Sequence, residues 1–206
     1  MTHFSAHDRD LIKSFLADHG IKRVNERAAL KKLVQAVSAI PWGEGRTIED
    51  VLQSEKVGTC TGKHLVLEAG LQELGIACRS VVCTFRWQDQ EIRFPQRLKD
   101  ILTKHTWLHA HNFIQVQNSS AEWIDVDVTW DGDLRRHGFR VLPSDWDGEH
   151  PFVGLIILER WDGIDMHSKK DELLHMLTDD QRHAREQFLR GFIAWIQSLR
   201  REEKES

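Results

Sequence analysis

Apolar residues recur at helical spacing near both ends of the chain and at alternating positions between them. Ser5 precedes a helical pattern that runs to about Asp18 and ends at Gly20, and Asn25 precedes a second one. Serine and asparagine are favoured at the start of a helix because their side chains accept hydrogen bonds from free backbone N–H groups. One face of the second pattern consists of Ala29, Leu33, Val37 and Ile40. These patterns predict two N-terminal helices.

The middle of the chain alternates apolar and polar residues with a period of two, which is typical of strands with one buried face. The predicted strands are residues 76–85, 111–118, 122–130 and 152–160. Near the C-terminus, Thr178 and Gln181 have the spacing of a helix capping box, and an apolar stripe at helical spacing follows them. We therefore expect an α+β fold that combines an antiparallel sheet with N- and C-terminal helices.

Composition favours a single domain over residues 1–206. Hydrophobic residues make up 40% and charged residues 29% of the chain, a balance typical of a soluble globular domain with a real core. The net charge of −4 provides no basic surface for nucleic acid. There is no apolar run long enough to span a bilayer and no secretory signal at the N-terminus. We therefore expect that the protein binds neither nucleic acid nor a membrane. The sequence does not indicate an oligomeric state.

The cysteines point to a reducing, cytoplasmic location. Cys60, Cys78 and Cys83 are an odd number, and no C-x-x-C pair of the zinc-binding type occurs. A disulfide framework is therefore not expected. The one metal-site alternative is a pair formed by His109 and His111, for which no third ligand with suitable spacing is present.

The stretch "GTCTGKHLVLEAGLQELG", residues 58–75, carries the candidate nucleophile. Its apolar positions predict a helix that begins near Cys60 and ends at Gly75. A thiol in the first turn of a helix experiences the positive end of the helix dipole and the unpaired backbone N–H groups, and both favour the thiolate. The alternative is an ordinary buried cysteine, because free cysteine is among the residues most often buried.

A strand pair supplies a candidate base and acid. A thiolate requires a group that takes its proton and a second group that orients the first. If the hairpin formed by residues 111–130 centres on Ser119, His111 lies opposite Asp127. A register shifted by one pair places His111 opposite Thr129 instead. Asp125 shares the face of Asp127, and both aspartates are also typical of the solvated face of an antiparallel sheet.

A cysteine at the start of a helix, followed along the chain by a strand with histidine and a strand with aspartate, resembles the transglutaminase-like group of papain-related thiol enzymes. The matching text is Gly58-Thr59-Cys60, "LGIACRSVV" at 74–82, "HNFIQV" at 111–116 and "WIDVDVT" at 123–129. The resemblance covers residues 26–130, the expected core, and leaves residues 131–206 as a strand and helical extension. Where the family strand usually reads H-A-W-V-E-V, this chain has Asn112, Phe113 and Gln115, and Val128 replaces a proline.

The resemblance implies a helix bearing Cys60 packed on an antiparallel sheet that carries His111 and Asp127. It implies acyl transfer or hydrolysis at an amide bond, with Cys60 as nucleophile, His111 as general base and acid, and Asp127 as the orienting acid. The substrate would be a peptide, a protein or a small amide, and neither a metal nor an organic cofactor is required. The alternative is a catalytically idle transglutaminase-like binding or interaction module.

Further residues are candidates for substrate contact. Gln53 is a candidate side-chain donor to an oxyanion, beside the backbone N–H of Cys60. The connection 86–108 leaves the strand after the Cys60 helix and returns just before His111, so we expect it to act as a binding loop or lid. The aromatic residues expected to line a substrate cleft are Trp107, Phe113 and Trp123.

Overall fold

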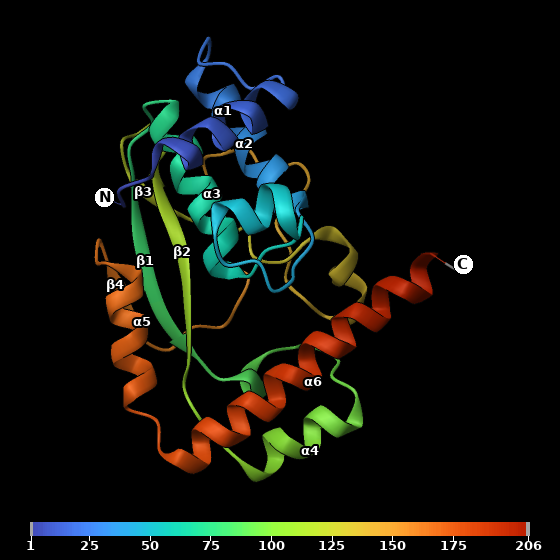
Figure 1. Cartoon of the computed structure of the whole chain (residues 1–206). Helices are drawn as coiled ribbons and strands as arrows, with labels where there is room; N and C mark the ends of the chain where they lie inside the picture. Colours follow the sequence, from blue (N-terminus) through green and yellow to red (C-terminus); the bar gives the residue numbers. More distant parts are fainter. Residues whose placement is uncertain (1, 205–206) are drawn as a thin grey trace.

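The computed structural model describes residues 2–204, with side chains as far as residue 201, and it has the expected α+β architecture (Figure 1). In the described part of the chain, four strands form one antiparallel sheet of order β3-β2-β1-β4. The strands are β1 (Cys78–Phe85), β2 (His109–Gln117), β3 (Trp123–Val126) and β4 (Arg160–Asp162). The α-helices are α1 (Ala6–Asp18), α2 (Glu26–Ala39), α3 (Cys60–Glu73), α4 (Gln96–Lys104), α5 (Met166–His175) and α6 (Asp179–Lys204).

Local sequence signals account for the ends of several helices. The Ser5 side chain accepts from the backbone N–H of Asp8 at the start of α1, and Asn25 accepts from Ala28 at the start of α2. Thr178 and Gln181 exchange side-chain and backbone hydrogen bonds, as a capping box does. Short turns complete the fold: the π-helical η1 (Asp50–Ser54) and the 3₁₀ helices η2 (Trp87–Asp89) and η3 (Gly132–His137).

The predicted strand 152–160 is wrong for most of its length. Phe152 forms an isolated bridge with Val126, and a regular strand begins only at Arg160. The segment between them is irregular because its backbone bonds side chains as well as strands: Gly154 donates its N–H to Asp127, and Ile156 donates to Gln90. The strand expected over 122–130 is likewise shorter, since β3 ends at Val126.

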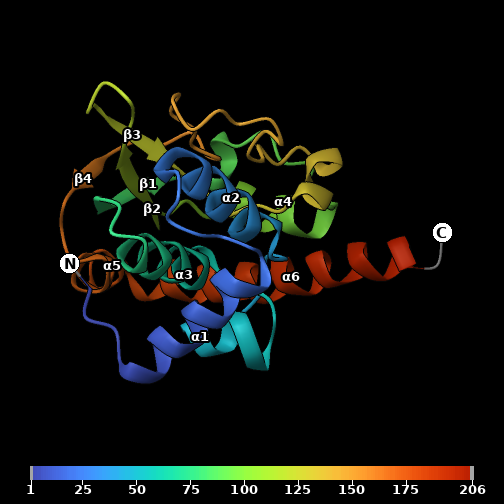
Figure 2. The same cartoon turned by 90° about the horizontal axis from the view of Figure 1, so that it is seen from above.

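Among the described residues, two large hydrophobic clusters form the core. The first lies between α1, α2, α3 and the sheet. The second is rich in aromatic rings and lies between α4, α6, η2 and the end of β1. Figure 2 shows α3 and α5 on the same side of the sheet, and both helices contact β1 and β2. No helix in the described part of the chain combines the length and apolarity needed to cross a membrane.

A buried lysine ties α3 to the segments around it. Lys63 is fully buried, and its ammonium group donates to the carbonyl oxygens of Ser38 (3.1 Å), Ile40 (2.7 Å) and Thr129 (3.2 Å). Burial lowers the pKa of Lys63 to about 7. Two backbone segments, the C-terminal end of α2 and the segment that follows β3, therefore depend on one side chain of α3 for hydrogen bonds.

We predict that Lys63→Met lowers the free energy of unfolding by about 2–4 kcal/mol, because it leaves buried carbonyl groups without donors. The measurement is urea unfolding followed by circular dichroism. Lys32→Met is the matched control, since Lys32 is exposed on α2. Equal stability of the two variants would contradict the structural role of Lys63.

Candidate active site

Cys60 begins α3 because close backbone packing holds the turn before it. The Thr59 side chain caps the helix by accepting the N–H of Gly62, and the Thr59 N–H donates to the carbonyl of Gly45. A Cβ atom at Gly62 would lie 2.4 Å from that same Gly45 oxygen, so the close approach requires glycine. The first N–H groups of α3 have no partner inside the helix, so the backbone N–H of Cys60 is available to a ligand.

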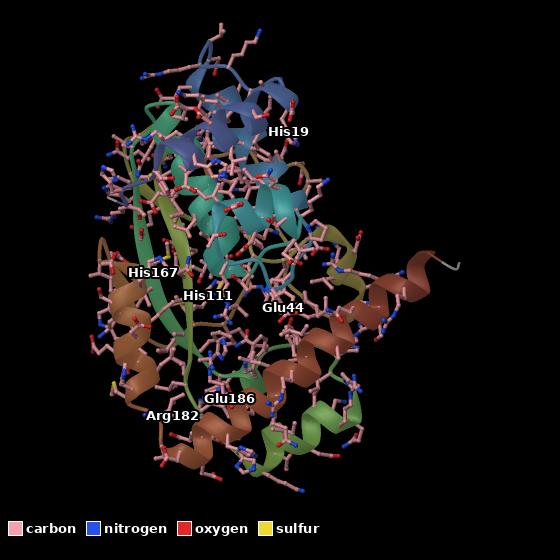
Figure 3. All side chains as sticks on the ribbon, in the orientation of Figure 1. His19, Glu44, His111, His167, Arg182 and Glu186 are labelled. Atoms are coloured by element: carbon pink, nitrogen blue, oxygen red, sulfur yellow. The ribbon has the colours of Figure 1, made fainter. Side chains whose placement is uncertain are left out.

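The structure brings Cys60, His111 and Asp127 together. His111 on β2 lies close enough to the Cys60 thiol for each group to shift the pKa of the other, and Figure 3 shows His111 near the end of α3 at which Cys60 lies. The Nε2 atom of His111 lies 3.0 Å from Oδ2 of Asp127. Because Nε2 faces Asp127, Nδ1 is the ring nitrogen available to the thiol. Cys60 is half-buried, whereas His111 and Asp127 are buried.

The assumed register of the β2–β3 hairpin is wrong by one pair. Gln115 lies opposite Asp125 and Ile114 opposite Val126, so the alternative register applies. Since β3 ends at Val126, however, Asp127 has left the ladder, and its carboxylate reaches His111 from a loop. Asp125 instead bonds Gln115 and Arg160.

The charges of the three groups support one another. Burial by itself would raise the pKa of the Cys60 thiol, but Lys170, the hydrogen bond with His111 and the charge of His111 lower it to about 6. Burial would lower the pKa of His111, but the charge and hydrogen bond of Asp127, with those of Cys60, raise it to about 9. His111 also holds the pKa of Asp127 well below its usual range, against the effect of burial. Between about pH 6 and 9 the pair is therefore a thiolate and an imidazolium.

A second buried histidine, His64, has a structural part in the site. Its Nδ1 lies 2.7 Å from the Cys60 carbonyl oxygen, and its Nε2 accepts the backbone N–H of Val128 at 3.2 Å. Burial lowers the pKa of His64 to about 3, so the ring is neutral with its proton on Nδ1. The ring thus joins the first turn of α3 to the residue after Asp127.

Lys170 on α5 is a site residue that the sequence did not indicate. Its ammonium group lies 3.5 Å from Sγ of Cys60 and 2.8 Å from the hydroxyl of Thr61, and it also donates to the side-chain oxygen of Asn112. The helix that carries it lies between the predicted strand 152–160 and the capping box at Thr178, where the sequence pattern predicts no element. A single lysine in an amphipathic helix gives no signal that would distinguish it from a surface residue.

The expected substrate-contact residues do not lie on one open surface. Phe113 is fully buried in a small cluster with Val81 and Cys83, and Trp107 is buried against Phe188 of α6. Trp123 is 36% exposed and lies under the guanidinium of Arg79. Gln53 is exposed on η1.

The connection 86–108 is part of the aromatic core. Its side chains Trp87, Phe94 and Trp107 are buried in the second cluster, where Trp87 and Phe94 pack on Phe188 and Phe192 of α6. A segment held by this many buried rings does not have the loose packing expected of a lid.

Comparison with known proteins gives no assignment: no family model and no curated protein sequence matches this chain. Within the part of the chain that the structure describes, no group of three or more His, Cys, Asp or Glu side chains is arranged to hold a metal ion. The functional argument therefore depends on the geometry of the site.

We predict that iodoacetamide alkylates Cys60 at pH 7 in the folded protein well before Cys78 or Cys83. Burial raises the pKa of Cys78 to about 12 and also raises that of Cys83. The rate at Cys60 should rise with pH through a midpoint near 6, because its pKa is lowered. Peptide mapping by mass spectrometry after timed quenching measures each site.

His111→Gln removes the charge and the hydrogen bond that His111 gives to Cys60, so the midpoint should move up by about 1 pH unit or more. A midpoint between about 8 and 9 in the unmodified protein would mean that Cys60 behaves as an unperturbed thiol.

Proposed function

We propose that this chain catalyses thiol-dependent acyl transfer or hydrolysis at an amide bond through Cys60, His111 and Asp127. The observation that carries the proposal is the position of His111 between the Cys60 thiol, whose pKa it lowers, and the buried carboxylate of Asp127, which lies 3.0 Å from Nε2 of His111. A nucleophile, a base and an orienting acid in this order are what covalent acyl transfer requires.

The chemistry follows from the charge state of the pair. The Cys60 thiolate attacks the carbonyl carbon, a C–S bond forms, and the developing oxyanion is stabilised by the backbone N–H of Cys60. Protonated His111 then gives its proton to the leaving amine as the C–N bond breaks, which leaves a thioester and a neutral imidazole. Asp127 keeps the imidazole in place throughout. His111 then takes a proton from water or from an amine, and either acceptor releases the acyl group.

The resemblance to transglutaminase-like thiol enzymes supports the same proposal. It places the nucleophile on a helix, and the base and acid on adjoining strands, in the order found here over residues 26–130. It also carries the expectation of a peptide, protein or small amide substrate and of a cytoplasmic setting, with which the three free thiols are compatible. The residues 131–206 have no counterpart in the resemblance.

The direct test is acylation by p-nitrophenyl acetate. We expect an acetyl group on Cys60, detected by intact mass and peptide mapping, with release of p-nitrophenol between about pH 6 and 9. The rate should fall below pH 6, where the thiol is protonated, and above pH 9, where His111 loses its proton. The rate at which Cys60 loses its acetyl group, measured with and without an added amine, shows whether water or the amine is the acceptor. Acylation no faster than in Cys60→Ala would support the idle binding module.

We predict that Asp127→Asn lowers the acylation rate by about 10³–10⁴-fold with the fold retained. The asparagine amide can donate to Nε2, which then places the imidazole proton on Nδ1, facing the thiol, so that the ring cannot accept the thiol proton.

Asp125→Asn is the matched control, because Asp125 bonds Arg160 and Gln115 and none of the three site residues. Its activity should change only slightly, and thermal melts of both variants separate loss of folding from loss of chemistry. Equal activities would mean that another group orients His111.

A further inference from the structure

The cation beside Cys60 has no carboxylate partner among the residues that the structure describes. Lys170 donates to the sulfur of Cys60, to the Thr61 hydroxyl and to the Asn112 side-chain oxygen. None of the described carboxylates lies within ion-pair distance of it, and Asp127 is occupied by His111. When Cys60 is ionised, the thiolate is therefore the negative charge that Lys170 faces.

Acylation removes that partner. In the thioester the sulfur is neutral, and His111 is neutral once it has given up its proton, but Lys170 keeps its charge. A half-buried ammonium beside neutral groups is unfavourable unless a new anion reaches it. Arg185 on α6 adds positive charge near His109, whose pKa is lowered by burial, Arg185 and Lys170.

A second, independent feature points to a ligand at the same place. Asn112 is fully buried, and its Oδ1 is taken by Lys170 and Thr61. Because Oδ1 faces the ammonium, the orientation of the amide is set and Nδ2 is a donor, yet Nδ2 is buried without a partner. Buried donors are normally satisfied. A ligand oxygen that reaches Lys170 therefore has a free N–H close by.

From these contacts we propose that Lys170 and Asn112 form an anion subsite that selects acyl groups bearing a carboxylate a few carbon atoms from the reacting carbonyl. The proposal rests on the proposed function, since it names the substrate class of the same thiol. A carboxylate oxygen bonded to Nζ lies within about 6 Å of the Cys60 sulfur. That distance allows one to three carbon atoms between the thioester carbonyl and the carboxylate, as in the acyl group of a short dicarboxylic acid.

Iodoacetate and iodoacetamide provide the test, because they differ only in a carboxylate against a neutral amide. Both form an S–C bond with loss of iodide, and both react with the thiolate, so the ratio of their rates at one pH is independent of the Cys60 pKa. The iodoacetate carboxylate comes within roughly 3–4 Å of the sulfur, within reach of Lys170. With free cysteine, repulsion between two anions makes iodoacetate the slower reagent.

We expect Cys60 in the full-length protein to react faster with iodoacetate than with iodoacetamide, with saturation at increasing iodoacetate. Lys170→Gln should lower the iodoacetate-to-iodoacetamide rate ratio by about tenfold or more, which corresponds to the loss of one charge-assisted hydrogen bond. His111 remains in both proteins, so the change in the ratio isolates Lys170.

Lys169→Gln is the matched control. It removes the same charge from the same helix, but Lys169 pairs with Glu172 and lies over Trp161, so the rate ratio should equal that of the unmodified protein. An unmodified ratio as low as that of free cysteine, or a ratio unchanged in Lys170→Gln, overturns the anion subsite. Failure of the proposed function has a different result: neither reagent then modifies Cys60 faster than it modifies a free thiol.

Discussion

The buried carboxylate of Asp127 is the group on which the arrangement of the site depends, because a buried charge is tolerated only when it is paired and hydrogen-bonded. Its two oxygens accept from His111 on β2, from the N–H of Thr129 and from the N–H of Gly154. To meet these donors the chain must leave the sheet after Val126. The segment that follows Phe152 must also approach closely: a Cβ at Gly154 would lie 2.9 Å from the Arg140 carbonyl oxygen and 3.3 Å from the Asp127 carboxylate. The Asp127 carboxylate that binds the backbone at Thr129 and Gly154 is therefore also the group that orients His111.

The same region joins the two hydrophobic clusters. Lys63 of α3 bonds the carbonyl of Thr129, and two residues further on Asp131 accepts from the Trp42 N–H and from Arg200 of α6. The C-terminal helix is thus tied to the loop that carries Asp127, although it contributes none of the three residues Cys60, His111 and Asp127. The ring of His111 lies near rings from two elements. Its centroid is 6.2 Å from that of His64 on α3 and 6.2 Å from that of Phe85 in the aromatic cluster. A change in the aromatic cluster can therefore reach His111 through Phe85, and a change in α3 can reach it through His64.

The sequence predicted what is encoded locally. The caps Ser5 and Asn25, the start of α3 at Cys60 and the strands β1 and β2 each depend on a few neighbouring residues, and each is found in the structure. The expected burial of a single face is not found, because successive residues of both strands are buried. The register of the hairpin and the strand 152–160 were wrong, because both are decided by partners distant in sequence. Periodicity cannot show that β3 stops early or that Gly154 bonds a carboxylate instead of a strand. Asp127 still lies next to His111, because its side chain is long enough to span the one-pair difference between the predicted and the observed register.

The three thiols show how much of the site lies outside the local sequence. Cys78 and Cys83 lie in β1, where burial raises their pKa values, and Cys60 differs from them through His111 and Lys170. His111 comes from a strand 51 positions away, and Lys170 comes from a helix 110 positions away. Packing this many polar and charged groups around one sulfur contributes little to stability, because well-packed apolar residues of similar volume are often equally stable or better. An idle module gains nothing from such an arrangement. A reactive thiolate would account for burying these polar and charged groups. That is the strongest physical reason for preferring the proposed enzyme to the binding module.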